Sequence, residues 1–464
     1  MSEEPTSTKK RFLFGLSAFP DQLTYQAFTV LVFTYYFAVV GIPIFQMWLA
    51  FFAWGIWNAI NDPLLGALSD RTKQKGKLGK RKFYLIISLV PLSLMMILLF
   101  TVPAGIEFYY FIFIIFAFEF VYTLFDVNVN AVFPEMFPTE KERASVNIFL
   151  KGLTLIAVII ASVVPTLIIS PLVPLTNSPT EVAKIQSMYI MAGIVLAVIT
   201  FVLAIPFLKY GIDEKEELDE HFEKRPAFFE SLKHTLKNKT FVKFTIGNTM
   251  IWYCFTVLLT AFPLYAVFVL GIEEDSFLVG IILMTVLLSA ALLIPVHQKI
   301  GSKIGMRNGM IVGLILWIVA LFPLVLLTND ELSRMLAIAV FAFMGFGLAA
   351  ALFYIDILHG DVIDQDALKF GVKRSASFYG INALIHRIST LLSITTIALV
   401  FSGTGWAGYD PNPGVNVIIG LKLLMFLFPA LALVVSIICW KVYELHGETL
   451  AKMREELAKH PEIK

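Results

Sequence analysis

Apolar residues along the chain gather into long runs, not into the alternating or heptad patterns of soluble strands and coiled coils. A helix that crosses the hydrocarbon core of a bilayer needs about 20 apolar residues. The runs predict twelve transmembrane helices, at residues 12–40, 45–68, 83–103, 107–132, 146–170, 184–208, 242–270, 276–296, 308–327, 333–357, 378–402 and 416–440. Because backbone polar groups must be paired within lipid, and runs this long exclude a β-barrel, the predicted fold class is an all-α integral membrane protein.

The composition agrees with a chain whose solvent is lipid. Charged residues make up 15% of it, against about 25% in soluble proteins, whereas 58% of the residues are apolar or aromatic. The net charge of +1 gives no reason to expect a nucleic-acid partner. Cys254 and Cys439 lie in apolar runs without a CxxC pair, so neither a disulfide framework nor a thiolate metal site is expected.

Basic residues between the runs predict how the chain is oriented, because Lys and Arg near helix ends stay in the cytoplasm. The loops after the second, fourth, eighth and tenth runs carry clusters of them, whereas the odd-numbered loops carry only Lys184 and Arg334. We therefore expect a multi-pass protein of the cell membrane, plasma or cytoplasmic, with both termini in the cytoplasm.

A charged stretch at residues 209–241 divides the predicted helices into two sets of six. The basic loops DRTKQKGKLGKRK and HQKIGSKIGMRNG occupy matching places in the two halves. We expect an N-terminal bundle at 1–208, a cytoplasmic linker at 209–241, a C-terminal bundle at 242–440 and a partly helical cytoplasmic tail at 441–464. Two parallel six-helix repeats with a site between them are typical of transporters.

Ionisable residues inside the predicted helices are the main functional signal. Each costs at least about 2.5–3.5 kcal/mol at mid-bilayer, so such residues usually line an ion or solute path. The candidates are Asp21, Asp62, Glu119, Asp126, Lys151, Asp356, His386 and Arg387.

The most specific polar pattern lies in the second predicted helix. The side chains that share a face at helical spacing are Trp54, Asn58, Asn61 and Asp62. Pro63 removes a backbone donor and can free a carbonyl in the preceding turn. The pattern predicts a cation or proton site, with a purely structural pair between Asp62 and Arg387 or Lys151 as the alternative.

The fourth predicted helix carries a polar stripe made of Glu119, Tyr122, Thr123, Asp126 and Asn130. A polar stripe on an apolar helix predicts the wall of a polar cavity. Asp21, which lies one turn before Tyr25, and Lys151 are further candidates for this wall.

Three stretches of the sequence carry a family resemblance over nearly the whole chain. The run NAINDPLLGALSDRTKQKGKLGKRKFYL, with YTLFDVNVNAVFPEMFPTEKERAS and DVIDQDALKFGVKRSASFYGINALIHR, resembles the glycoside–pentoside–hexuronide cation symporters, the melibiose permease-like family of the major facilitator superfamily. The resemblance implies the major facilitator fold, with twelve transmembrane helices in two pseudo-symmetric six-helix bundles.

The resemblance also implies roles for individual residues. The cation or proton site, including a Na⁺ site, would be formed by Asn58, Asp62 and Thr123, with Arg387 facing it and Asp126 nearby. The solute site would comprise Asp21, Tyr25, Tyr122, Asp126, Asn130, Lys151 and Asn382. Lys151 replaces an Arg and loses its planar fork, and Asn130 replaces an aromatic that would stack on a sugar, so the sugar specificity does not transfer.

We therefore expect a secondary active transporter that couples a cation to a small polar solute by alternating access. The solute is expected to be a sugar or glycoside, with a lysophospholipid or another amphipathic solute as the alternative. From another class, a non-transporting nutrient sensor is retained. An enzyme is not expected, because the chain has no HExxH or GxSxG motif, and the carrier is expected to work as a monomer in membrane lipid.

The sequence favours H⁺ as the coupling ion. A Na⁺ site built from two carboxylates cancels the charge of the ion, whereas Asp62 near Arg387 supplies only one. A single acid can still carry a proton. Na⁺ is kept as the alternative, because Asp126 could donate a second carboxylate.

The orientation can be tested with accessibility labelling of intact cells. Cysteines placed at residues 175 and 410 should react with an impermeant reagent from outside, because their loops are poor in Lys and Arg. Labelling of the 209–241 linker from outside would contradict the predicted orientation.

Overall fold

The computed structural model describes residues 7–72, 79–137, 140–213, 237–371 and 375–460, and within these ranges it contains helices and no strand. The helical elements of the first half are α1 Thr8–Gly15, η1 Phe19–Leu23, α2 Thr24–Thr34, η2 Tyr35–Val39, α3 Ile44–Arg71, α4 Lys80–Leu98, α5 Glu107–Met136, α6 Glu140–Ile168, α7 Pro179–Pro206 and η4 Phe207–Gly211. Those of the second half are α9 Lys239–Phe268, α10 Ser276–Ile304, α11 Met306–Leu321, η5 Phe322–Val325, α12 Glu331–Phe370, α13 Ser375–Gly403, α14 Val415–Met425, α15 Leu427–Lys441 and α16 Gly447–Lys459.

These elements form the twelve predicted crossings, and the predicted fold class is confirmed. Nine helical stretches within the described ranges are each long and apolar enough to span a bilayer. The other three crossings are the first, which is divided among α1, η1, α2 and η2, the second, which is α3, and the eleventh, which is α13. The linker predicted at 209–241 lies mostly outside the described residues, which stop at 213 and resume at 237.

Several helices are longer than the apolar runs that predicted them. The clearest case is α12, which continues to Phe370, whereas the apolar run ends near residue 357. Its last turns bury His359, Asp361 and Asp366, and Gly371 ends the helix in the left-handed conformation at φ 74°. Hydropathy marks only the lipid-exposed part of a helix, so it cannot predict the turns that continue beyond the bilayer.

The first crossing is interrupted where it carries Asp21. Pro20 has no amide hydrogen to donate to the preceding turn, and the residues around it form the wide π turn η1. The hydroxyl of Thr24 donates to the carbonyl of Pro20 at 2.7 Å. Proline chemistry thus shapes the turn that presents the Asp21 carboxylate.

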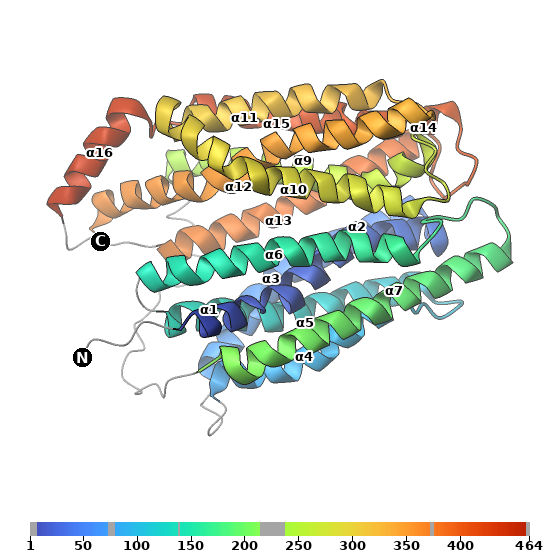
Figure 1. The fold of residues 1–464 in the computed structure, drawn as a ribbon, viewed down its shortest axis with the longest axis horizontal. Coiled ribbons are helices and arrows are strands. Elements are labelled where there is room, and N and C mark those ends of the chain that lie inside the picture. Colours follow the sequence, from blue (N-terminus) through green and yellow to red (C-terminus); the bar gives the residue numbers. More distant parts are fainter. Residues whose placement is uncertain (1–6, 73–78, 138–139, 214–236, 372–374, 461–464) are drawn as a thin grey trace. The chain divides into compact units, whose positions relative to one another are not determined.

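The chain divides into two compact units, of which the first holds residues 1–220 together with 272–281 and 405–413. In this unit α5 packs between α3 and α4, α4 also packs on α7, and α1 packs on α6 (Figure 1). Lys10 and Asp213 form an ion pair. Since Lys10 begins the first crossing and Asp213 follows the sixth, the chain enters and leaves this bundle at the same end.

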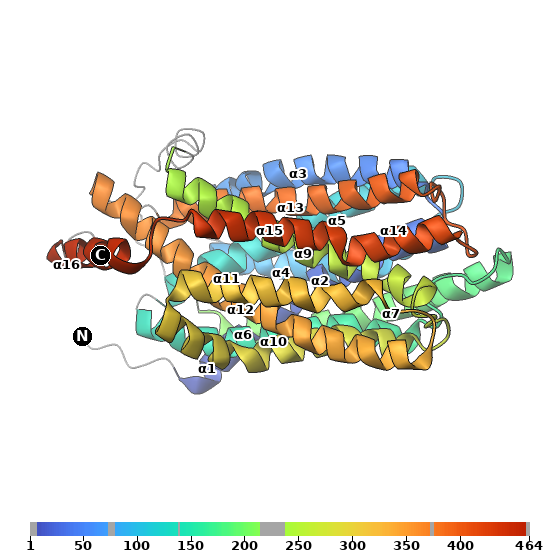
Figure 2. The same ribbon diagram turned by 90° about the horizontal axis from the view of Figure 1, so that it is seen from above.

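The second unit holds residues 221–271, 282–404 and 414–464. Helix α9 is its central element and packs against α12, α13, α14 and α15 (Figure 2). The buried imidazole of His359 stacks on Phe244 of α9, with ring centroids 4.6 Å apart. Polar groups in α12 are therefore covered by aromatic packing within the same unit.

The C-terminal tail forms the short amphipathic helix α16, which packs on α12. The Arg454 guanidinium donates to the carboxylate of Asp361 at 2.9 Å, and Met453 is buried on the same helix. The Asp361 side chain is only 6% exposed, whereas that of Arg454 is 57% exposed. Arg454 therefore supplies the charged hydrogen-bond donor of a largely buried carboxylate.

The change Arg454→Gln should release α16 from α12, because it leaves the buried Asp361 carboxylate without its charged donor. A lost partner of a buried polar group costs about 1–3 kcal/mol, and we expect the amides of α16 to exchange hydrogen roughly tenfold faster in mass spectrometry. The control Lys459→Gln removes an exposed pair with Glu455 on the same helix and should leave exchange unchanged. Equal exchange in Arg454→Gln and the wild type would show that the pair does not hold the helix.

Candidate functional site

A buried carboxylate lies at the contact between α3 and α5. Glu119 of α5 is 0% exposed. Asn58 Nδ2 donates to its Oε1 at 2.5 Å, and Trp54 Nε1 donates to its Oε2 at 3.1 Å. Asn61 Nδ2 donates to the backbone carbonyl of Glu119 at 3.1 Å. Three side chains of α3, spaced at 54, 58 and 61, thus face one residue of α5.

The hydroxyl of Thr123 joins this carboxylate to that of Asp62. Thr123 Oγ1 lies 2.9 Å from Asp62 Oδ1 and 3.5 Å from Glu119 Oε1. Glu119 and Thr123 are four residues apart on α5, so they lie on the same face of the helix. One hydroxyl therefore borders two carboxylates, one from each helix.

Two amide oxygens at this contact have no hydrogen-bond partner among the described residues. They are Oδ1 of Asn58 and Oδ1 of Asn61, and both side chains are buried. A buried oxygen without a partner loses its hydration and gains nothing in return. The two amide groups at the contact between α3 and α5 therefore have unused acceptor capacity.

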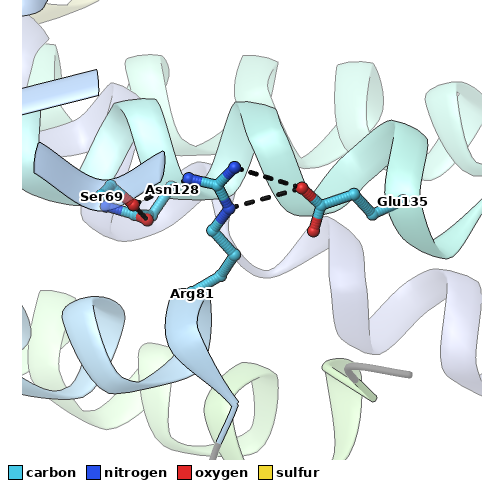
Figure 3. A network of polar contacts seen from close by, with 4 residues as sticks. All are labelled: Ser69, Arg81, Asn128 and Glu135. Carbon is cyan, nitrogen blue, oxygen red and sulfur yellow. Dashed lines mark hydrogen bonds and ion pairs between the residues drawn. The ribbon is translucent and has the colours of Figure 1, made fainter. Parts of the chain in front are cut away.

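The same α3–α5 contact continues into a second polar network (Figure 3). Arg81 of α4 donates to the Ser69 hydroxyl at 2.7 Å, and Ser69 donates to Asn128 Oδ1 at 2.5 Å. Arg81 also forms an ion pair with Glu135 at 3.3 Å. This network connects α3, α4 and α5 and fixes the register of α3 against α5 about two turns beyond Asp62.

A second cluster of polar groups lies on a neighbouring face of α5. The hydroxyl of Tyr122 donates to Asp21 Oδ1 at 2.8 Å, and Gln22 Nε2 donates to Asp21 Oδ2 at 2.9 Å. The ring of Tyr25 lies 5.0 Å from that of Tyr122. The first crossing and α5 thus bring Asp21, Tyr25 and Tyr122 together.

The remaining predicted solute residues of the first unit lie on α5 and α6. Asn130 Nδ2 donates to Asp126 Oδ1 at 2.8 Å, one turn apart on α5. Lys151 of α6 is exposed and interacts electrostatically with Asp21. The polar stripe predicted on α5 therefore divides into two faces, with Glu119 and Thr123 toward α3, and Tyr122 toward the first crossing.

Aromatic rings form a continuous column between the two clusters. Tyr122 stacks with Phe118 at 5.8 Å, Phe118 stacks with Phe28 at 4.6 Å, and Phe28 stacks with Trp54 at 5.7 Å. Trp54 is also a donor to Glu119, and Tyr122 is the donor to Asp21. The column connects the Asp21 carboxylate to the Glu119 carboxylate through packed side chains of one unit.

Two predicted residues, Asn382 and Arg387, lie on α13 in the second unit. Asn248 of α9 donates to Asn382 Oδ1 at 3.1 Å, and Arg387 is half-buried. Asp356 is exposed on α12. The side chains of His386 and Pro63 lie outside the described residues.

The predicted cation site did not include Glu119. Asp126 stays the predicted donor of a second carboxylate for Na⁺. The structure places the Glu119 carboxylate beside the Thr123 hydroxyl that also borders Asp62. A usable signal was present, because Glu119 precedes Thr123 by one helical turn. The spacing alone did not show which face of α5 meets α3.

Solved structures of transporters are similar to this chain in fold. The nucleoside transporter NupG has a TM-score of 0.64 at 13% identity, covering 94% of this chain and 100% of that one. A bacterial homologue of the human lysosomal transporter Spinster has a TM-score of 0.65 at 14% identity, covering 97% and 99%.

Similar sequences also extend over nearly the full length. The sodium-dependent lysophosphatidylcholine symporter 1 of Gallus gallus is 23% identical over 98% of this chain and 90% of its own. The uncharacterized symporter YjmB of Bacillus subtilis (strain 168) is 22% identical over 98% and 96%. The profile of the family described as MFS/sugar transport protein matches residues 13–447. Because this match spans nearly the whole chain, the protein belongs to the MFS/sugar transport protein family, which consists of membrane transporters and not of enzymes.

Proposed function

We propose that the protein is a cation-coupled symporter that carries a small polyhydroxylated solute, a sugar or glycoside, by alternating access. One observation carries the proposal. Within the first unit, α5 presents one polar cluster to α3 and another to the first crossing, and an aromatic column joins them. A symporter needs two sites whose occupancies influence each other, and this arrangement supplies two clusters on one helix.

The solute is assigned to the cluster around Asp21 and Tyr122. Asp21 and Asp126 are acceptors for hydroxyl hydrogens, and Asn130 can both donate and accept. The tilted ring of Tyr25 offers an apolar surface to the face of a sugar ring. Lys151 interacts electrostatically with Asp21 and can donate hydrogen bonds to the hydroxyl oxygens of a solute.

The cation is assigned to Asp62, with Thr123 and Asn58 beside it. Hard cations prefer oxygen ligands, and this contact supplies carboxylate, hydroxyl and amide oxygens. Arg387 of α13 is assigned to the coupling step, as a positive charge whose role the bound cation takes over.

Coupling then follows from differential affinity, since a ligand shifts a two-state equilibrium only by binding one state more tightly. Cation binding at Asp62 would fix the Glu119–Thr123 turn of α5, and the same turn carries Phe118 and Tyr122. The column of rings from Trp54 to Tyr122 would pass that constraint to Asp21. The cation would thereby stabilise the geometry that binds the solute.

A lysophospholipid is the second candidate solute. Relatives in Gallus gallus, Xenopus tropicalis and Homo sapiens bear the name sodium-dependent lysophosphatidylcholine symporter 1. The Tyr25 and Tyr122 rings beside Asp21 offer the cation–π contacts that suit a quaternary ammonium, and Lys151 offers a charge to a phosphate. The ammonium and the phosphate of the lipid head group thus both have partners in the same cluster.

Uptake into proteoliposomes decides between the solutes. A panel of glycosides and a panel of lysophospholipids are tested under an imposed Na⁺ gradient and under an imposed pH gradient. Gradient-driven accumulation of a glycoside supports the proposal, and accumulation of a lysophospholipid favours the second candidate. Binding of a solute without accumulation or counterflow would instead indicate a sensor.

The site belongs, in this proposal, to a monomer in the cell membrane whose termini lie in the cytoplasm. The basic loops support this orientation.

Tyr122→Phe and Asp21→Asn should weaken solute binding to different degrees. Asp21→Asn removes a charged acceptor and should cost about 2 kcal/mol or more, roughly 30-fold in Kd. Tyr122→Phe keeps the ring and removes only the hydroxyl, so we expect about tenfold or less. Glu273→Gln alters an exposed carboxylate in the same unit and is the control. Wild-type Kd values in both variants, measured by calorimetry, would remove this cluster from the solute site.

Asp62→Asn should uncouple the carrier. The variant has no negative charge at position 62 with which to bind the cation. Solute should therefore still exchange across the membrane but no longer accumulate against its gradient. Counterflow and gradient-driven uptake are measured side by side in proteoliposomes. Full accumulation by Asp62→Asn would mean that this carboxylate takes no part in coupling.

A further inference from the structure

A segment from the second half of the chain lies against the first unit. Residues 405–413 connect α13 to α14, yet they belong to the first unit, whereas residues 282–404 and 414–464 on either side of them belong to the second. We call residues 405–413 the outer strap, because they contact the end of the first crossing that is opposite Lys10. In the predicted orientation this end of the unit faces outward.

Trp406 anchors the outer strap. Its side chain is 2% exposed and meets the ring of Phe37 edge-on, with centroids 5.2 Å apart and an interplanar angle of 84°. The ring of Tyr409 lies 6.0 Å from that of Phe37 and 5.8 Å from that of Trp406. Phe37 is fully buried in η2, the last part of the first crossing. Because the burial of a large ring in edge-to-face contact is strongly stabilising, Trp406 holds the strap on the first crossing.

Two hydrogen bonds attach the outer strap to other parts of the same unit. The backbone amide of Ile44 donates to the carbonyl of Ala407 at 2.8 Å. Ile44 is the first residue of α3, so its amide has no acceptor within the helix, and the strap supplies one. The Tyr409 hydroxyl donates at 2.5 Å to the carbonyl of Pro174, which lies between α6 and α7. The strap therefore contacts the first crossing, α3 and the α6–α7 connection.

The outer strap also has hydrogen bonds of its own. Gly405 enters it at φ 85°, a conformation that glycine adopts without strain. Trp406 Nε1 donates to the carbonyl of Asp410 at 3.3 Å, and the amide of Asn412 donates to Asp410 Oδ1 at 2.9 Å. A loop that is ordered by its own contacts can leave its docking surface as one piece.

Residues 272–281 are a second segment from the later half of the chain that belongs to the first unit. The Ser170 hydroxyl donates to the carbonyl of Glu274. Gly280 lies so close to α6 that a Cβ atom there would be 2.2 Å from Thr166 Oγ1. Thr166 and Ser170 lie at the same end of the unit as Phe37, because α6 ends where the chain continues outward. Both segments therefore contact the outer end of the first unit.

We propose that the outer strap is the gate of the carrier at this end, and that undocking of Trp406 from Phe37 opens the solute cluster to the outside. This inference rests on the proposed alternating access and adds the segment that has to move. The strap is covalently continuous with the second unit and docked on the first, so relative movement of the two units at this end pulls directly on it. Its contacts are a buried ring and directed hydrogen bonds, which are either made or broken.

The test measures how fast single cysteines react with an impermeant maleimide that is added to either side of oriented membrane vesicles. All proteins carry Cys254→Ala and Cys439→Ala, which remove the native thiols. The first reporter is Thr29→Cys, one turn outward from Tyr25 on the first crossing. The second is Asn130→Cys, on the inward part of α5. The two reporters measure access to the solute cluster from the strap side and from the opposite side.

Trp406→Ala removes the anchor and should shift the carrier toward the state that is open on the strap side. We expect Thr29→Cys to react roughly tenfold faster from that side, and Asn130→Cys to react more slowly from the other by a similar factor. Trp406→Phe keeps a ring against Phe37 and should return both rates to within about threefold of the wild type. Tyr109→Ala removes an exposed ring at the same end of the unit and is the matched control, for which neither rate should change.

Tyr409→Phe tests the same claim with a change too small to unfold the protein. It removes the hydroxyl that donates to the Pro174 carbonyl and keeps the ring beside Phe37. Both rates should shift in the same directions as in Trp406→Ala, by about two- to threefold.

Wild-type reaction rates in Trp406→Ala and Tyr409→Phe would overturn the gate. Faster reaction of both reporters would overturn it too, because a loop that merely covers the unit would loosen the protein without closing the opposite side. Opposite shifts of the two rates support the gate. If those shifts occur in a carrier whose wild type accumulates no solute under either ion gradient, the gate stands and the symporter proposal is overturned.

Discussion

The burial of one carboxylate between two membrane helices is the constraint on which the rest of this account depends. An ionisable group within a bilayer costs several kcal/mol unless it is satisfied by partners. Glu119 is satisfied by Trp54 and Asn58 of α3, and the shared Thr123 hydroxyl adds Asp62 to the same cluster. The polar residues of α3 lie on one face because they must meet this group. This face of α3 therefore packs against α5 and also carries the hydrogen-bond donors of a buried carboxylate.

Helix α5 connects that interface to the proposed solute cluster. Glu119 and Thr123 point toward α3, while Tyr122 of the same turn donates to Asp21. Phe118, Phe28 and Trp54 fill the space between them in a stacked column. Because packed side chains cannot deform continuously, a change on one face of this turn is felt on the other. The Ser69–Arg81–Asn128 network connects α3, α4 and α5 further along the same helices.

Much of the fold could be predicted from the sequence, because apolar runs directly encode contact with lipid. The ends of the helices could not be predicted from these runs. Helix α12, for example, continues for several turns beyond its apolar run, where α9 and α16 cover its polar residues. The pairing of Asp62 with Thr123 was expected from the family resemblance. The contacts of Glu119 with α3 were not, because they depend on which face of α5 packs on α3. The Asp21–Tyr122 hydrogen bond likewise depends on the π turn at Pro20, which no apolar pattern encodes.

The claim that two clusters on one helix couple a cation to a solute predicts a thermodynamic linkage. The most direct measurement is the solute Kd of the purified protein with and without saturating NaCl, together with the Na⁺ affinity with and without solute. Linkage requires both affinities to change by the same factor, typically about 5–150-fold. We expect Na⁺ to tighten solute binding and solute to tighten Na⁺ binding equally. A solute Kd that is the same in NaCl and in choline chloride would contradict the account.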